Sequence, residues 1–281
     1  MAEPIRIDSL LPPEMARRAE YLGTRKAEMN AVTMFTLAVL AGAFIGLGAI
    51  FATTMATGGG ALPYGVNKLL VGLVFCLGLI LVIVAGAELF TGNNLIVMAW
   101  ASGKVSTRGL LRNWVIVYIG NFVGSVLMAV LMFFTRQYTF AGGAVGQTAL
   151  AIANSKVNLD FVQAIALGIM CNALVCLAVW LTFSARTTID KIAAIIFPIT
   201  AFVAAGFEHC VANMYFVPMG LFIEQFDPAF VAGLEGAPDL ANLTWGSFLL
   251  NNLLPVTIGN IIGGAVLVAA TYWFIYLRTR E

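Results

Sequence analysis

Six long hydrophobic segments determine what this chain can fold into. They occupy residues 32–57, 68–101, 111–134, 158–185, 190–222 and 247–277. A helix needs about 20 apolar residues to cross the roughly 30 Å of hydrocarbon in a bilayer, and each segment reaches that length. Charged residues make up only 10% of the chain, whereas a soluble domain carries about 25%. The sequence therefore predicts an all-α integral membrane protein with six transmembrane helices, and the net charge of +1 disfavours a nucleic-acid partner.

The distribution of basic residues predicts the orientation. An even number of spans places both chain ends on one side of the membrane. If that side is the cytoplasm, only Lys68, Arg136 and Lys156 of the 15 Lys and Arg residues lie on the other side. This asymmetry is the positive-inside pattern, so we expect cytoplasmic N- and C-termini.

Residues 9–24 have the pattern of a short amphipathic helix. Pro12 and Pro13 suit its first turn, and Arg17 and Arg18 face away from the apolar side. The predicted apolar face consists of Leu10, Leu11, Met15, Ala19 and Leu22. Such a helix lies on the membrane surface or packs against the bundle. We assign residues 1–31 to a cytoplasmic N-terminal segment that anchors the chain, with a lid as the alternative role.

The second and fifth segments are too long for simple transmembrane helices. A continuous helix of about 33 residues would measure about 50 Å, which exceeds the bilayer thickness. Each segment also carries a glutamate and asparagines in its middle. Non-helical backbone is tolerated inside a membrane where it lines a cavity, so we predict that both helices are broken there.

The two halves of the chain repeat the same pattern. In the broken segments, Gly86, Glu88 and Asn93 match Gly206, Glu208 and Asn213 at an offset of 120 residues. In the third and sixth segments, Asn113, Val117, Ile119, Gly120, Asn121 and Gly124 match Asn252, Val256, Ile258, Gly259, Asn260 and Gly263. The first and fourth segments match more weakly, through Phe35, Ala38 and Gly42 against Phe161, Ala164 and Gly168.

Three segments per half require the second half to be inverted relative to the first. Residues 32–145 then form the first three-helix repeat, and residues 146–281 form the second, with a cytoplasmic C-terminal tail. Inverted repeats with broken helices place a permeation site near the membrane midplane, where the breaks meet. The Gly-x3-Gly pairs of the matched segments are assigned to close helix packing.

Charged residues inside the membrane need partners. Lys26 and Lys156 precede the first and fourth segments at corresponding repeat positions. We predict two triads, which are Lys26–Glu88–Asn93 and Lys156–Glu208–Asn213. A structural role at the breaks is favoured for both, and attraction of an anion by Lys156 is the second interpretation.

His209 is the one histidine of the chain, and it lies in the predicted break of the fifth segment. A histidine changes charge near neutral pH, so it suits proton transfer in a pore. Its repeat counterpart is Leu89, and Thr91 in the other break can face it. A single histidine without Cys or His partners is a poor metal site, so no metal or cofactor is expected. A dry constriction excludes hydrated ions, whereas a small weak acid can cross if it is neutralised there.

Three stretches of this sequence, AGAELFTGN, GFEHCVANM and VTIGNIIGG, resemble the formate/nitrite transporter family. The similarity extends over essentially all 281 residues. It implies a homopentamer in the bacterial inner membrane, surrounded by lipid, with an aquaporin-like protomer and one pore in each protomer. It also implies a channel or transporter for formate and similar small monovalent anions, with protons involved through His209.

The resemblance assigns roles to further residues. It implies an outer constriction of Phe75, Leu79 and Phe202, an inner constriction of Leu89, Phe90 and Val175, and a central site of His209, Thr91 and Asn172. Nitrite and hydrosulfide remain alternative substrates because those branches share the Glu-His motif. An intramembrane enzyme using Glu208 and His209 is disfavoured, because no nucleophile or metal cluster accompanies that pair.

Overall fold

The computed structural model describes residues 9–236 and 239–278, and all regular structure in these ranges is helical. The α-helices are α1 Pro12–Glu28, α2 Ala31–Ala56, α3 Tyr64–Ile80, α4 Val97–Ala101, α5 Thr107–Thr135, α6 Ala144–Val157, α7 Phe161–Ser184, α8 Thr188–Ala204, α9 Cys210–Phe226, α10 Pro228–Ala232, α11 Trp245–Ser247, α12 Leu254–Ile261 and α13 Thr271–Tyr276. Short 3₁₀ segments lie at Gly59–Ala61, Gly92–Ile96, Gln137–Thr139 and Ala141–Gly143, and π-helical segments at Leu81–Gly86, Phe248–Leu253 and Ile262–Ala270. The π segments continue α3 and join α11, α12 and α13 into one helical stretch.

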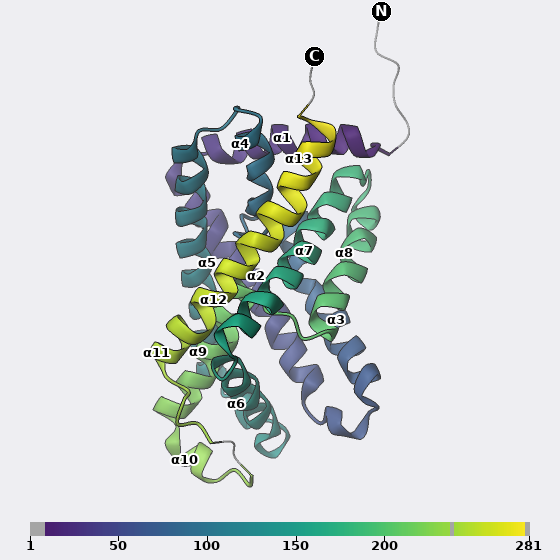
Figure 1. The fold of residues 1–281 in the computed structure, drawn as a ribbon. Coiled ribbons are helices and arrows are strands. Elements are labelled where there is room, and N and C mark those ends of the chain that lie inside the picture. The colour runs from purple at the N-terminus through teal and green to yellow at the C-terminus, as the bar shows by residue number, and fades with distance from the viewer. Residues whose placement is uncertain (1–8, 237–238, 279–281) are drawn as a thin grey trace, which may run out of the picture.

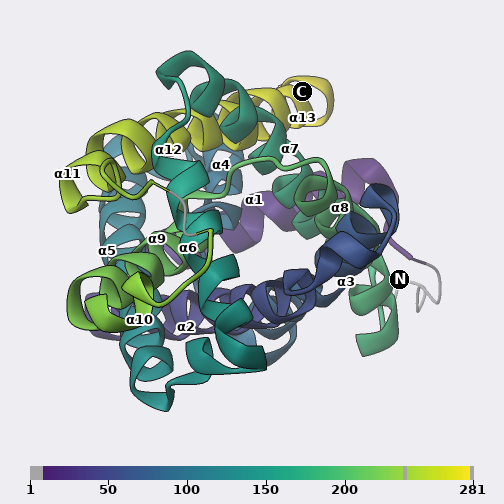
Figure 2. The ribbon, with the colours of Figure 1, turned by 90° about the horizontal axis from the view of Figure 1, so that it is seen from below.

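The described residues contain five helical stretches that are long and apolar enough to cross a membrane. They are Ala31–Ala56, Tyr64–Gly86, Thr107–Thr135, Phe161–Ser184 and Trp245–Tyr276. Each overlaps one of the six predicted segments. The remaining predicted segment, the fifth (residues 190–222), is divided between α8 and α9, which have 17 residues each. Seen along the bundle, helices α2, α3, α5, α7 and α8 and the stretch that contains α12 are arranged around a common axis (Figure 2).

Two glycines stop the helices at matching places. Gly86 ends the helical stretch that begins with α3, and Gly206 follows the end of α8. Their φ angles are +85° and +75°, in the left-handed region that glycine adopts without a Cβ penalty. The chain then runs without helical structure as far as Thr91 in one case and His209 in the other.

Helix α1 lies across one end of the bundle, nearly perpendicular to the long helices, and α13 ends beside it (Figure 1). The helix begins at Pro12 and continues to Glu28, beyond the predicted range of 9–24. Met15 and Ala19 are buried as expected, but Leu11 is 66% exposed, so its assignment to the apolar face was wrong. Leu11 precedes the first helical turn as the N-cap residue, and the helical periodicity does not extend to it.

Polar contacts dock α1 onto the bundle. The Lys104 ammonium pairs with the buried Glu20 carboxylate at 2.6 Å. Arg18 donates from Nη1 to the Phe183 carbonyl of α7 at 3.3 Å. A Cβ on Gly23 would lie 3.2 Å from the Ala99 side chain of α4, so α1 sits close to that helix.

Close approaches at glycines confirm the expected packing role of the Gly-x3-Gly pairs. A Cβ on Gly124 of α5 would overlap the Val39 carbonyl of α2. A Cβ on Gly263 would overlap the Ile169 carbonyl of α7 in the same way. Small residues at these points let the helix backbones touch.

The same contacts correct the repeat alignment. Val39 and Ile169 are equivalent, because each carbonyl faces a matched glycine, and they are 130 residues apart. Lys26 and Lys156 are separated by the same 130 residues. The weak match of the first and fourth segments, at an offset of 126 residues, was therefore wrong by four residues. Four residues are about one helical turn, so the shifted alignment kept small residues on the same helix face.

Candidate functional site

Asn121 of α5 ties together the chain at the first interruption. Its Nδ2 donates to the carbonyls of Ala38 (2.8 Å) and Glu88 (2.9 Å), and its Oδ1 accepts from the Phe90 N–H at 2.9 Å. The side chain is fully buried. A non-helical segment inside an apolar bundle thus obtains partners for its backbone groups without water.

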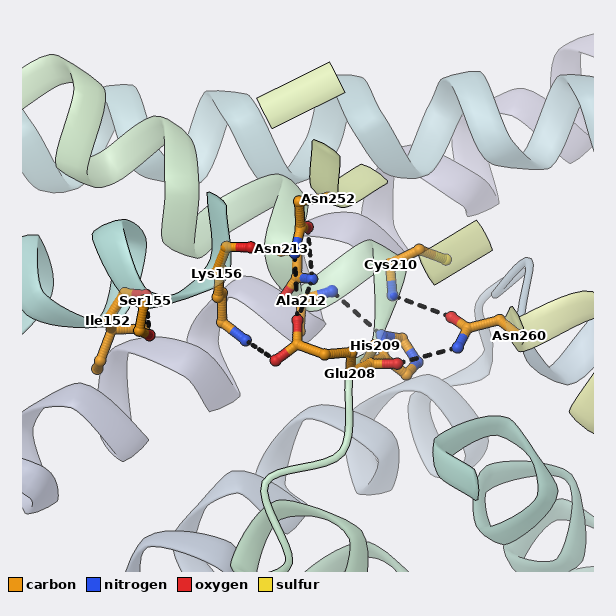
Figure 3. A network of polar contacts seen from close by, with 10 residues as sticks. All are labelled: Ile152, Ser155, Lys156, Glu208, His209, Cys210, Ala212, Asn213, Asn252 and Asn260. Carbon is orange, nitrogen blue, oxygen red and sulfur yellow. Dashed lines mark hydrogen bonds and ion pairs between the residues drawn. The ribbon is translucent and has the colours of Figure 1, made fainter. Parts of the chain in front are cut away.

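Asn260 of α12 does the same at the second interruption (Figure 3). Its Nδ2 donates to the carbonyls of Gly168 (2.8 Å) and Glu208 (2.9 Å), and its Oδ1 accepts from the Cys210 N–H at 3.0 Å. The two asparagines were matched in the sequence repeat but received no role. Polar residues at matched positions of two apolar segments were the signal that would have identified them.

The first predicted triad is assembled at the end of α1. Lys26 Nζ contacts Glu88 Oε1 at 2.6 Å and Asn93 Oδ1 at 3.0 Å. Asn93 Nδ2 donates to Glu88 Oε2 at 2.7 Å and to Asn113 Oδ1 at 2.9 Å. Asn113 in turn donates to the Lys26 carbonyl at 3.1 Å. The charge of the buried carboxylate is therefore balanced, and both of its oxygens accept hydrogen bonds.

The second triad lies at the end of α6 (Figure 3). Lys156 Nζ contacts Glu208 Oε1 at 2.8 Å. Asn213 Nδ2 donates to Glu208 Oε2 at 2.6 Å and to Asn252 Oδ1 at 2.7 Å. Unlike its counterpart Lys26, Lys156 makes no hydrogen bond to the asparagine oxygen, which is buried and has no partner in the part of the chain that the structure describes. Lys156 lies instead 5.4 Å from the centre of the Phe216 ring.

The two interruptions meet at a buried Thr91–His209 pair. Thr91 Oγ1 lies 3.0 Å from His209 Nε2, and the side chains are 0% and 3% exposed. The Ala212 N–H, in the first turn of α9, donates to His209 Nδ1 at 3.1 Å. Nδ1 is therefore an acceptor, and the proton of the neutral ring is on Nε2, which donates to Thr91.

Asn172 of α7 lies next to this pair without a hydrogen bond to His209. Its Nδ2 donates to the Asn260 carbonyl at 2.7 Å and to the Thr91 carbonyl at 3.3 Å. At the offset of 130 residues, Asn172 stands where the first repeat has Gly42. Its bond to the Thr91 carbonyl ties α7 to the segment that carries Thr91.

A narrow waist separates two larger cavities. One of about 370 Å³ opens toward α1, and one of about 480 Å³ lies beside Lys156. Between them is a space of only about 10 Å³. It is lined by Ile45, Phe75, Leu79, Leu89, Val175, Ile199, Phe202 and His209. Apart from His209, every side chain of this set is apolar.

Two aromatic residues of the expected constrictions, Phe75 and Phe202, line the waist, whereas the third, Phe90, does not. Phe75 and Phe202 pack edge to face at 5.7 Å, and Phe202 stacks on His209 at 6.0 Å. Phe90 instead packs against Trp114 and Tyr118 of α5 and does not line any of these three cavities. Ile45 and Ile199 line the waist and were missed, because an apolar residue within an apolar segment carries no distinguishing signal.

Comparison with known proteins places this geometry in a family. A formate/nitrite transporter family model matches residues 13–274. The chain belongs to the formate/nitrite transporter family. It is 46% identical over 276 residues to the formate channel FocA of Escherichia coli K12, which covers 98% of this chain and 97% of that protein. It is 40% identical over 284 residues to a probable formate transporter of Methanothermobacter thermautotrophicus, covering 95% of this chain and 97% of that protein.

Solved structures of the family share the fold. A pentameric formate channel with formate bound is 50% identical in sequence, with a TM-score of 0.83 over 88% of this chain and 98% of the other. An ion channel of the family is 28% identical, with a TM-score of 0.80 over 93% and 98% of the two chains. The chain is thus a multi-pass, all-helical membrane protein whose relatives are channels and transporters and not enzymes.

Proposed function

We propose that this protein conducts formate and similar small monovalent anions across the bacterial inner membrane. His209, held by the buried Thr91, carries the proposal, because it is the one polar side chain among the described residues that line the apolar waist between two cavities. Relatives named as formate channels, at 46% identity over nearly the full chain, support the substrate.

The architecture that we propose is six transmembrane helices in two inverted three-helix repeats, with the second and fifth broken. Residues 1–31 form the N-terminal segment, residues 32–145 the first repeat, and residues 146–281 the second. The paired contacts of Asn121 and Asn260, and the two lysine triads, support this division. Helices α8 and α9 together then supply the fifth span.

The waist makes transport of a bare anion costly and transport of a neutral acid easier. An anion that leaves water for an apolar space loses its hydration. Thr91 does not line the waist itself, but its hydroxyl accepts from His209 Nε2–H and keeps its own hydrogen, which an anion that reaches His209 can accept. Lys156 lines the cavity on one side of His209, but its pair with Glu208 at 2.8 Å offsets its charge, which supports its structural role at the break.

Proton transfer by His209 requires a ring movement. The neutral ring cannot give up its Nε2 proton without becoming an anion, so it must first be protonated at Nδ1. Nδ1 is occupied by the Ala212 N–H at 3.1 Å. Because a donor cannot bond to a protonated nitrogen, the ring turns away from Ala212 when it takes up a proton, and it can then neutralise a bound anion.

The assembly that we propose is a homopentamer embedded in lipid, with the N- and C-termini in the cytoplasm. The related pentameric channel supports the number of subunits. Large apolar side chains on the outside of the single chain, such as Val32 (77% exposed), Leu131 (59%) and Phe197 (81%), provide surface for lipid or neighbouring protomers. Native mass spectrometry of the purified protein tests the subunit number.

Uptake of formate, nitrite and hydrosulfide by the same proteoliposomes tests the function. We expect formate uptake well above that of protein-free vesicles, and a loss of most of it in Thr91→Val, which keeps the shape but removes the hydroxyl. Nitrite or hydrosulfide uptake that exceeds formate uptake would assign the protein to another branch of the family. Absence of uptake of all three would reject the proposal.

A further inference from the structure

The cavity that opens toward α1 is lined by more positive than negative side chains. Arg18 and Lys26 come from α1, Lys191 comes from the start of α8, and Glu88 is the one acidic residue among the described residues of the lining. Lys26 is neutralised by Glu88 at 2.6 Å. The excess positive charge therefore belongs to Arg18 and Lys191.

These two side chains have hydrogen-bond donors to spare. Arg18 uses Nη1 on the Phe183 carbonyl, and a guanidinium has five N–H donors. Lys191 is half-buried, and its ammonium carries three donors. Within the described residues no carboxylate pairs with either side chain. The bond to Phe183 holds the Arg18 guanidinium at the cavity wall, near the chain that leads from α7 to Lys191.

We infer that Arg18 and Lys191 form an anion-loading site in the α1-facing cavity, which takes small monocarboxylates such as formate before they reach the waist. A carboxylate has two oxygens and can accept from both cations at once, whereas Lys26 is already held by Glu88 and Asn93. The inference rests on the proposed function, because the site serves the anion that the pore conducts.

The opposite cavity offers a weaker counterpart. It is lined by Lys68, Lys156 and Glu208, and Lys156 is paired with Glu208 at 2.8 Å. Lys68 lies 5.6 Å from the centre of the Tyr64 ring and is the remaining cation. Among the described residues, this cavity has one cation without a carboxylate partner, whereas the α1-facing cavity has two. The two cavities therefore differ in anion affinity, and the α1-facing cavity saturates at the lower anion concentration.

The effect of each cation follows from its distance to the bound anion. A cation that donates a hydrogen bond to the carboxylate lies about 4 Å from its charge, and in water-like surroundings this changes the local anion concentration roughly fivefold. Removal of both cations is therefore expected to raise the half-saturating formate concentration on the α1 side roughly twentyfold. The difference should shrink as salt is raised, because the Debye length is about 8 Å at physiological ionic strength.

Formate flux in right-side-out and inside-out membrane vesicles tests the inference. We expect Arg18→Gln with Lys191→Gln to raise the half-saturating formate concentration for entry from the α1 side only. Lys191→Arg, which keeps the charge, should behave like wild type. Arg25→Gln is the matched control, since Arg25 is an exposed cation of α1 outside the cavity lining.

A second control and an internal check complete the design. Lys68→Gln should raise the half-saturating concentration for entry from the opposite side. At low formate concentration and zero voltage, a passive channel must give equal permeability in both directions for every variant. An unchanged half-saturating concentration on the α1 side, or an equal rise on both sides, would overturn the loading site. Absence of formate flux in the wild-type protein would instead reject the proposed function.

Discussion

Replacement of Lys156 by methionine tests the energetic account of the second triad. Methionine keeps most of the length of the side chain and removes the charge. Glu208 is 6% exposed and would remain with its two asparagine neighbours but without a countercharge. Loss of one partner of a buried ion pair costs about 3–5 kcal/mol. The Lys156 side chain is still 14% exposed, so we expect the lower end, about 3 kcal/mol.

The first triad supplies the matched comparison. The Lys26 side chain is 32% exposed, and solvent screens its pair with Glu88 more strongly. Lys26→Met is expected to cost only about 1–2 kcal/mol. The two lysines occupy the same place in the two repeats, but they differ in burial and in one contact, because Lys26 also donates to Asn93 whereas Lys156 lies over the Phe216 ring.

The free energy of unfolding can be measured by adding SDS to the protein in mixed micelles and following tryptophan fluorescence. Glu208→Gln in the Lys156→Met background removes the uncompensated charge and should recover about 2 kcal/mol. The reasoning is refuted if Lys156→Met costs no more than Lys26→Met, or if the second substitution recovers nothing.

Three further changes test other parts of the structure. Gly263→Ala places a Cβ against the Ile169 carbonyl and should lower the free energy of unfolding by about 1–3 kcal/mol. Gly60→Ala, whose Cβ would meet no atom within 4 Å, should lower it little. Equal effects of the two substitutions would contradict the close helix contact. Asn260→Ala removes three hydrogen bonds at the interruption after α8 and should abolish the assembled protein on a native gel; normal assembly would show that the bonds are dispensable. Burial and the neighbouring Asp227 carboxylate raise the pKa of Tyr138 in the folded protein. The neutral tyrosine therefore stabilises the fold below its unfolded pKa of about 10, and this stability is lost as the pH rises above that value. Tyr138→Phe should weaken that loss of stability above about pH 10, and an unchanged pH profile would contradict the contribution of Tyr138.

Much of the site follows from the sequence because charges and amides are rare inside a membrane. Glu88 and Glu208 lie in apolar segments and must be paired, and the repeat indicates Lys26 and Lys156 as partners. The structure brings both pairs within 2.8 Å. The glycines before each glutamate likewise mark where helical structure stops.

The rest depends on features that carry no local signal. Ile45 and Ile199 line the waist, but nothing in the sequence separates them from other apolar residues of their helices. The orientation of Phe90 toward Tyr118, at 4.9 Å between ring centres, is decided by packing against α5. The alignment of the first segment with the fourth in the sequence repeat was wrong by one helical turn, because Gly and Ala recur at helical spacing throughout such segments.

Formate uptake as a function of pH, in wild type and in His209→Gln, tests the central claim most directly. Glutamine keeps a hydrogen-bond donor toward Thr91 but cannot be protonated near neutral pH. The account predicts that wild-type uptake increases with an inward proton gradient, and that the variant loses this dependence while it remains folded. A variant whose uptake follows the wild-type profile from acid to neutral pH would contradict the role of His209 at the waist.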